Sequence, residues 1–190
     1  MYLDFLGEGL FRELAEEFAD LMYDRGLLSL RELEAGVRLE PGVAARHRDL
    51  GCRLVQDAKP ALAREAFTKA LEFDPGDSLA RLGLACALDA IGLTQTAIEE
   101  LQVCLDDRPE YCPAMVAMGH CLQKLGEPRE AIRAYEQALR VNPGLRRTRE
   151  KLSLLLESFE NASGVESVRE QLEGNTSNDS SETAEVAYSG

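Results

Sequence analysis

Tryptophan is absent from this chain of 190 residues, and all aromatic residues together make up only 6% of it. A core with so few rings must be built from Leu, Ala, Val and Ile, which is more typical of helices than of sheets. Apolar residues reach 45%, enough to bury a core. The length fits one domain or one compact repeat array.

Residues that carry catalysis or hold metals are also scarce. The two histidines, His47 and His120, lie in no HExxH motif and near no CxxC pair, so we predict no metal site and no cofactor. GxxxxGK[ST] and GxSxG motifs are absent, and we expect no enzyme. An odd number of cysteines without a CxxC pair argues against disulfides and favours buried, reduced thiols. They are Cys52, Cys86, Cys104, Cys112 and Cys121.

Positive charge is in deficit, with 21 Lys and Arg against 34 Asp and Glu and a formal net charge of −13. Binding to nucleic acid needs clustered cations that displace counterions, so neither nucleic acid nor an anionic membrane is an expected partner. No apolar run reaches the roughly 18 residues of a membrane span. The N-terminus lacks the basic stretch of a signal peptide. We therefore expect a soluble, cytoplasmic protein.

Internal repetition is the strongest feature of the sequence. Pro75, Pro109 and Pro143 are spaced by 34 residues, and many apolar and small residues share this period. Large apolar residues three and four positions apart predict helices, and small residues permit close helix crossings. The equivalent positions are Leu50, Leu84 and Met118; Gly51, Ala85 and Gly119; Leu54, Leu88 and Leu122; Ala63, Ala97 and Ala131; Phe67, Leu101 and Tyr135; Ala70, Cys104 and Ala138.

Glycine and proline mark the ends of the predicted helices. Gly92 and Gly126 are expected to end first helices, because glycine adopts the left-handed conformation of a C-cap most easily. Pro60 and Pro128 fall in the first turn of second helices, where a missing N–H costs nothing. Each unit of 34 residues is therefore predicted to be a helix–turn–helix.

This pattern resembles the tetratricopeptide repeat (TPR) family, with its motif W-x2-L-G-x2-Y…A-x3-F…P. The tryptophan position holds His47, Arg81 and Met115 instead. The resemblance implies an all-α fold, an α-solenoid of stacked antiparallel helix pairs (TPR superhelix). It covers three repeats, at 44–77, 78–111 and 112–145, of which 112–145 matches the motif best.

The flanks are expected to extend the array. Residues 1–43 are predicted to form an N-terminal helical pair, which is either a degenerate repeat or a cap. Its helices are expected near 2–24 and 29–39, with a capping box at Ser29-x-x-Glu32. The apolar stripe of the first helix has several possible roles: a cap, a dimer contact, an exposed partner helix, or an occupant of its own groove. Residues 146–160 are expected to form a C-terminal capping helix with a solvated basic face, and 161–190 an acidic, mostly disordered tail.

The resemblance also implies a concave groove lined by the first helix of each repeat. This surface would be mostly neutral and apolar, which suits a peptide with apolar anchors. Some family members bind the acidic tails of chaperones with a clamp of lysine, asparagine and arginine side chains. The matching positions here are Arg48, Cys52, Gly83, Pro113 and Ala117, and of these only Arg48 keeps a positive charge. The expected groove residues are Arg48, Cys52, Val55, Gln56, Leu79, Leu82, Cys86, Asp89, Val116, His120 and Gln123.

The expected function is a non-catalytic protein–protein interaction module, an adaptor or scaffold that binds a peptide segment. Two alternatives stay open at this stage. A chaperone of a secretion system, similar in architecture to class II type III secretion chaperones, would dimerise through its N-terminal helix. A self-assembling structural protein would stack its repeats between chains. Self-association through the N-terminal helix is therefore a second possible contact.

Overall fold

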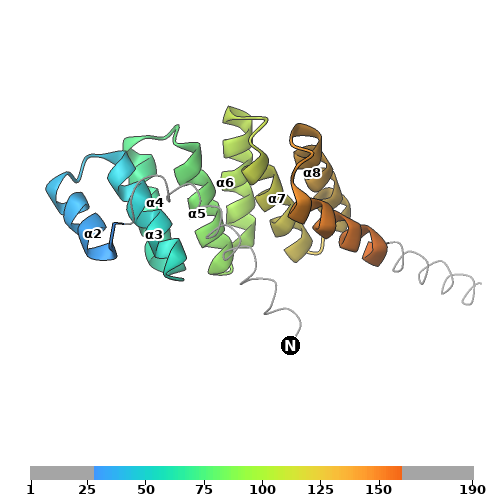
Figure 1. Cartoon of the computed structure of the whole chain (residues 1–190), viewed down its shortest axis with the longest axis horizontal. Helices are drawn as coiled ribbons and strands as arrows, with labels where there is room; N and C mark the ends of the chain where they lie inside the picture. Colours follow the sequence, from blue (N-terminus) through green and yellow to red (C-terminus); the bar gives the residue numbers. More distant parts are fainter. Residues whose placement is uncertain (1–27, 160–190) are drawn as a thin grey trace, which may run out of the picture.

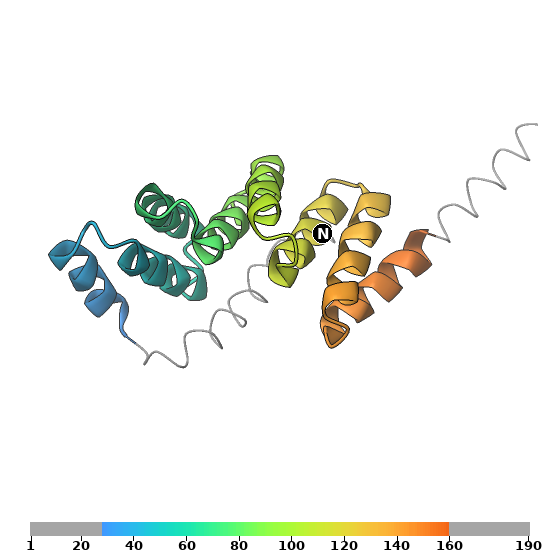
Figure 2. The same cartoon turned by 90° about the horizontal axis from the view of Figure 1, so that it is seen from above.

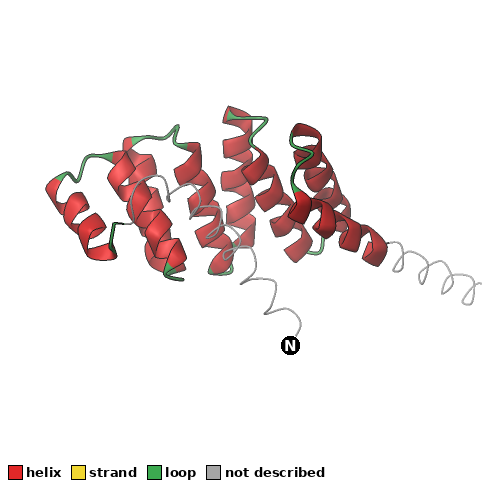
Figure 3. Cartoon of the chain, viewed as in Figure 1, coloured by secondary structure: helices red, strands yellow, loops and turns green. Residues whose placement is uncertain are grey.

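A computed structural model describes residues 28–159, and all regular structure in that range is helical (Figure 3). Successive helices run antiparallel and stack side by side into an elongated array (Figures 1 and 2). The predicted α-solenoid is confirmed. The helix expected near 2–24 and the tail 161–190 lie outside the described residues. The helices are α2 (Leu30–Leu39), α3 (Ala44–Gln56), α4 (Pro60–Phe73), α5 (Ser78–Ala90), α6 (Thr94–Asp107), α7 (Cys112–Lys124), α8 (Pro128–Val141) and a last helix over 146–159.

The helix ends follow the local sequence. The capping box of α2 forms as predicted, because Ser29 Oγ accepts from the backbone N–H of Glu32 while Glu32 accepts from the N–H of Ser29. Gly92 and Gly126 end α5 and α7 with φ angles of +87° and +80°. The equivalent position after α3 holds Ala58, which adopts the same left-handed region with φ of 54°.

Aromatic rings and glycines set how closely the helices approach. The ring of Phe67 is fully buried against the backbone of two first helices. A Cβ atom at Gly51 would lie 2.7 Å from the Phe67 ring, and one at Gly83 only 2.3 Å from it. Tyr135 excludes a side chain at Gly119 in the same way, at 2.7 Å. Large rings therefore require glycine opposite them, and this lets neighbouring helices pack closely.

The position that holds tryptophan in the family motif has another use here. His47 Nε2 lies 2.8 Å from the carbonyl oxygen of Pro41 and donates to it. Arg81 Nη2 donates to the carbonyl oxygen of Pro75 at 2.7 Å, and Arg149 donates to that of Pro143. Each of these three side chains therefore ties the start of its own helix to the proline six residues before that side chain.

The last helix covers the C-terminal end of the repeat array. Leu155 is buried and packs with Ala131 and Tyr135, and Leu152 is partly buried against the same cluster. Basic residues such as Arg146 and Arg149 are exposed on this helix. It therefore covers the apolar cluster at this end of the array. Within 28–159, no helix combines the length and the apolarity needed to cross a membrane.

Candidate functional site

The predicted groove residues lie on the first helices of the three repeats. Helix α3 packs against α5, and α5 packs against α7, so these helices form a continuous row. We call the surface of this row, with its predicted residues, the groove row. It brings side chains from three repeats together although they are far apart in the sequence. A partner lying along the row would contact all three repeats at once.

Burial divides the groove row into a floor and a partly exposed part. Cys52, Val55, Leu82, Cys86, Asp89 and His120 are buried and form the floor. The remaining residues keep partial access to solvent, and are the ones that a ligand could contact directly. They are Arg48, Gln56, Leu79, Val116 and Gln123.

Arg48, in the first repeat, is held by two acids. Its Nη1 donates to Asp77 Oδ2 at 2.9 Å, and its Nη2 lies 3.3 Å from Asp49 Oδ1. Burial acts to lower the pKa of Arg48, but the charges of Asp77 and Asp49 outweigh it and raise this pKa. Beside them, burial raises the pKa of the Cys52 thiol to about 12, with a further contribution from Asp49. Cys52 is therefore a neutral, unreactive thiol at physiological pH.

Asp89 is the centre of a polar network between the second and third repeats. It is 2% exposed, and its Oδ1 accepts from Thr94 Oγ1 at 2.7 Å and from Lys124 Nζ at 2.9 Å. Lys124 also donates to the backbone carbonyl of Asp89 at 3.0 Å. On the other side, His120 Nδ1 lies 3.9 Å from Asp89 Oδ2. Asp89 and His120 are predicted from the sequence as groove residues, whereas Thr94 and Lys124 are not.

The spacing of Lys124 from Asp89 in the sequence could have predicted their contact. Asp89 and Lys124 are 35 residues apart, one position more than the repeat period of 34. Residues one period apart lie at equivalent places on neighbouring repeats, so an acid and a base at nearly this spacing can meet across the repeat boundary. Thr94 carries no such signal, because its contact with Asp89 depends on the turn between α5 and α6.

Three of the five clamp positions, Cys52, Gly83 and Ala117, carry small or buried residues. Cys52 and Ala117 are each 1% exposed. Gly83 has no room for a side chain, because the Phe67 ring occupies the space. Long donor side chains could not be accommodated at these places without rearranging the core.

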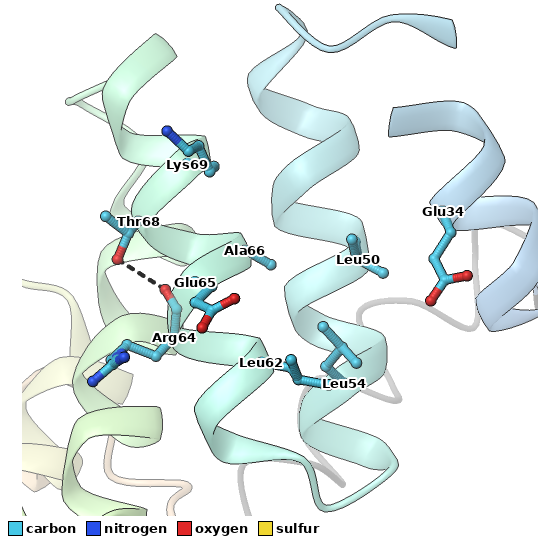
Figure 4. A pocket seen from close by; sticks show the side chains of 9 residues that line it. All are labelled: Glu34, Leu50, Leu54, Leu62, Arg64, Glu65, Ala66, Thr68 and Lys69. Carbon is cyan, nitrogen blue, oxygen red and sulfur yellow. Dashed lines mark hydrogen bonds between the residues drawn. The ribbon is translucent and has the colours of Figure 1, made fainter. Parts of the chain in front are cut away.

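Two surface pockets lie outside the groove row, at equivalent places in the array. The larger, about 630 Å³, lies between α2, α3 and α4 and includes Leu50, Leu54 and Leu62 (Figure 4). The other, about 430 Å³, is lined by residues of α6, α7 and α8, including Met118 and Leu122. Met118 and Leu122 are the repeat equivalents of Leu50 and Leu54, so these pockets are features of the stacking rather than a single specialised site.

The fold defines the protein as an α-solenoid of helix pairs, and the comparisons give its family. Two family models described as tetratricopeptide repeat match residues 48–111 and 114–145, together just over half of the 190 residues. The chain therefore belongs to the tetratricopeptide repeat family.

Curated relatives share this region. DnaJ homolog subfamily C member 3 of Homo sapiens is 28% identical over 127 residues, which are 67% of this chain and 25% of that protein. Small glutamine-rich tetratricopeptide repeat-containing protein 2 of Mycosarcoma maydis is 31% identical over 98 residues, or 48% of this chain and 28% of that protein. The chain thus spans about a quarter of the length of these relatives.

Solved structures share the fold. A crystal structure of MamA superposes with a TM-score of 0.64 at 24% identity, covering 80% of this chain and 89% of that one. The first TPR of Spaghetti (RPAP3), bound to an HSP90 peptide, gives a TM-score of 0.59 at 19% identity, covering 62% of this chain and 93% of that one. At these identities the likeness establishes the architecture alone.

Proposed function

We propose that this chain is a non-catalytic protein-interaction module, an adaptor or scaffold, that binds a segment of another polypeptide along the groove row. The observation that carries this proposal is the packing of α3 against α5 and of α5 against α7. Repeat proteins commonly bind their partners along an extended surface formed by stacked repeats. Two structures of family members support it, since Spaghetti is bound to an HSP90 peptide and the second TPR domain of human RPAP3 to an HSP70 peptide.

The partly exposed residues of the groove row favour an uncharged segment with apolar anchors. Leu79 and Val116 offer apolar contacts, while Gln56 and Gln123 carry amides that can both donate to and accept from a peptide backbone. The two cations at the row are already compensated: Arg48 pairs with Asp77, and Lys124 pairs with Asp89. An acidic peptide would have to compete with these buried carboxylates for its donors.

The clamp positions argue against acidic chaperone tails as the partner. Gripping a terminal carboxylate takes several charged or amide donors placed around it. Gly83 and Ala117 provide no side-chain donor, and the Cys52 thiol is buried. The proposed partner is therefore a segment with apolar anchors rather than a carboxylate tail.

Peptide selection tests this directly. A displayed random-peptide library would be selected on the immobilised full chain and counter-screened on Val116→Glu/Gln123→Glu, which adds two negative charges to the groove row. The buried Leu82 is left unchanged, because a charge there would break the core. The matched control, Gln102→Glu/Gln137→Glu, adds the same charge at exposed sites of the α6–α8 pocket.

We expect selected peptides to carry apolar anchors, to bind the control like wild type, and to lose at least about tenfold in affinity on the groove variant. Peptides that bind all three proteins equally would place the site elsewhere. Peptides selected for an acidic C-terminus would contradict the proposed partner chemistry. Leu14 and Phe18 belong to the apolar stripe of the helix predicted near 2–24. Concentration-dependent oligomers that dissociate on Leu14→Glu/Phe18→Glu would instead support self-assembly.

A further inference from the structure

Two side chains of the groove-row floor, Asp89 and His120, meet a third buried side chain of different ligand chemistry, Cys121. Asp89 comes from α5, whereas His120 and Cys121 are consecutive residues of α7. Their exposures are 2%, 6% and 1%, so all three are withdrawn from solvent. One carboxylate oxygen, one imidazole nitrogen and the thiol sulfur lie within 4.8 Å of one another. This is a compact, buried cluster rather than a patch of surface acids.

The ligand types and their spacing suit zinc. Imidazole nitrogen, thiolate sulfur and carboxylate oxygen are the donors that bind zinc in proteins, with bonds of about 2.0–2.3 Å. Tetrahedral geometry then places the donor atoms about 3.3–3.8 Å apart. The distance of 3.9 Å between His120 Nδ1 and Asp89 Oδ2 is already close to this range. Side-chain rotations that move the other donor atoms by about an ångström would bring them into this range as well.

The two oxygens of Asp89 are in different surroundings. Oδ1 is held by the Thr94 hydroxyl at 2.7 Å and by the Lys124 ammonium at 2.9 Å. Oδ2 is the oxygen that faces His120. Ligating carboxylates in metal sites are commonly fixed in this way, by hydrogen bonds to the oxygen that does not bind the metal. The network around Asp89 therefore holds Oδ1 and leaves Oδ2 to face His120.

We propose that Asp89, His120 and Cys121 bind a zinc ion that joins the second repeat to the third, with water as the fourth ligand. The Cys121 thiol releases its proton to solvent as the sulfur–zinc bond forms, so two anionic ligands balance the dication. Lys124 keeps its charge, paired with the other oxygen of Asp89. The sequence motifs indicated no such site, because His120 follows Asp89 by 31 positions and no CxxC or HExxH pattern joins them.

Calorimetric titration of the metal-free, reduced full chain with Zn²⁺ tests the proposal. Cobalt(II) serves as a spectroscopic probe, because a thiolate ligand gives it a charge-transfer absorption band. We expect one zinc per chain and a cobalt–thiolate band in the wild-type protein. His120→Ala and Cys121→Ser should each weaken zinc binding by at least about a hundredfold, and Thr94→Val by about tenfold. Cys121→Ser should also abolish the band.

The control is Cys104→Ser, since Cys104 is an equally buried thiol whose hydrogen-bond partner is Ser78 O, outside the cluster. It should bind zinc like wild type. Circular dichroism establishes that each variant is folded, and Asp89→Asn provides a nearly isosteric third variant. Wild type without a stoichiometric zinc site, or with the same affinity as His120→Ala and Cys121→Ser, overturns the proposal. No peptide is present, so this failure would leave the proposed peptide binding untouched.

Discussion

Lys124 on α7 holds Asp89 on α5 through two contacts, at 2.9 Å to the carboxylate and 3.0 Å to the backbone carbonyl of the same residue. The carboxylate is almost fully withdrawn from water, whereas the lysine keeps 29% of its side chain exposed. A charge buried to this degree is retained only where a partner and hydrogen bonds replace its hydration. Thr94 supplies the second donor. The floor of the groove row is thus held together by charge as well as by apolar packing.

Removing the lysine should destabilise the fold. Lys124→Met keeps the stem of the side chain but leaves Asp89 as a buried charge without its counter-ion, which typically costs about 3 kcal/mol. Urea denaturation in zinc-free buffer, followed by circular dichroism, measures the loss. Lys69→Met is the control, because the ion pair of Lys69 with Glu72 is exposed and should be worth less than about 1 kcal/mol. A similar small cost for both variants would contradict this account of Asp89.

A side chain at Gly83 should disturb the contact with Phe67. The Cβ of Gly83→Ala would meet the ring at 2.3 Å, and such overpacking costs about 1–3 kcal/mol. The better helix propensity of alanine returns up to about 1 kcal/mol, so we expect a net loss in the free energy of unfolding. Urea denaturation measures it. A stabilised Gly83→Ala variant would show that the ring moves aside freely.

The ring itself should account for that cost. In the next repeat the position of Phe67 holds Leu101, and the position of Gly83 holds Ala117. Phe67→Leu should therefore make Gly83→Ala less costly, and a double-mutant cycle should give a coupling of at least about 1 kcal/mol. Additive costs would mean that the two residues act independently.

Ala58 should gain from replacement by glycine. It adopts a φ of 54°, which strains any residue with a Cβ, whereas Gly92 and Gly126 stand at its equivalents. Ala58→Gly should therefore raise the free energy of unfolding by about 0.5–1 kcal/mol. Gly92→Ala provides the opposite test. A Cβ at Gly92 has open space around it, so any destabilisation there reports on backbone conformation alone. Effects of the same sign at both positions would refute this explanation.

Alkaline pH should weaken the fold through Cys52. Burial raises the pKa of its thiol from 9.0 to about 12, so the unfolded chain loses this proton first as the pH rises. The contribution to stability is complete below pH 9.0 and is lost as the pH rises toward 12, at roughly 1.4 kcal/mol per pH unit. Urea denaturation across this interval measures the slope. Cys52→Ala should lower the slope by roughly 1.4 kcal/mol per pH unit, which corresponds to one proton. An unchanged slope would contradict the attribution of this pH dependence to Cys52.

Much of the fold follows from local chemistry that the sequence makes visible. The prolines spaced by 34 residues, the glycines after α5 and α7 and the capping box at Ser29 each act within one helix end, and each was predicted correctly. The contact of Phe67 with Gly83 was not predicted. Periodicity identifies residues that face inward but does not say which neighbouring helix a ring will meet.

The site was less predictable than the fold. The family register placed Leu82, Cys86 and Val116 alike on the groove row, yet Leu82 and Cys86 are buried and Val116 is partly exposed. Exposure depends on everything packed around a residue, which no single repeat encodes. The convergence of His120 and Cys121 on Asp89 likewise depends on how α7 is rotated against α5, a property of tertiary packing rather than of motif spacing.

The contact between Phe67 and Gly83 also fixes the order of the repeats. Deleting residues 78–111 would keep the period but would bring Ala117 to the place of Gly83, where the Phe67 ring leaves no room for a methyl group. Although the units share one motif, they are not interchangeable parts. Phe67 of the first repeat is matched in size to Gly83 of the second, so the size of these two facing residues determines which repeat can follow the first.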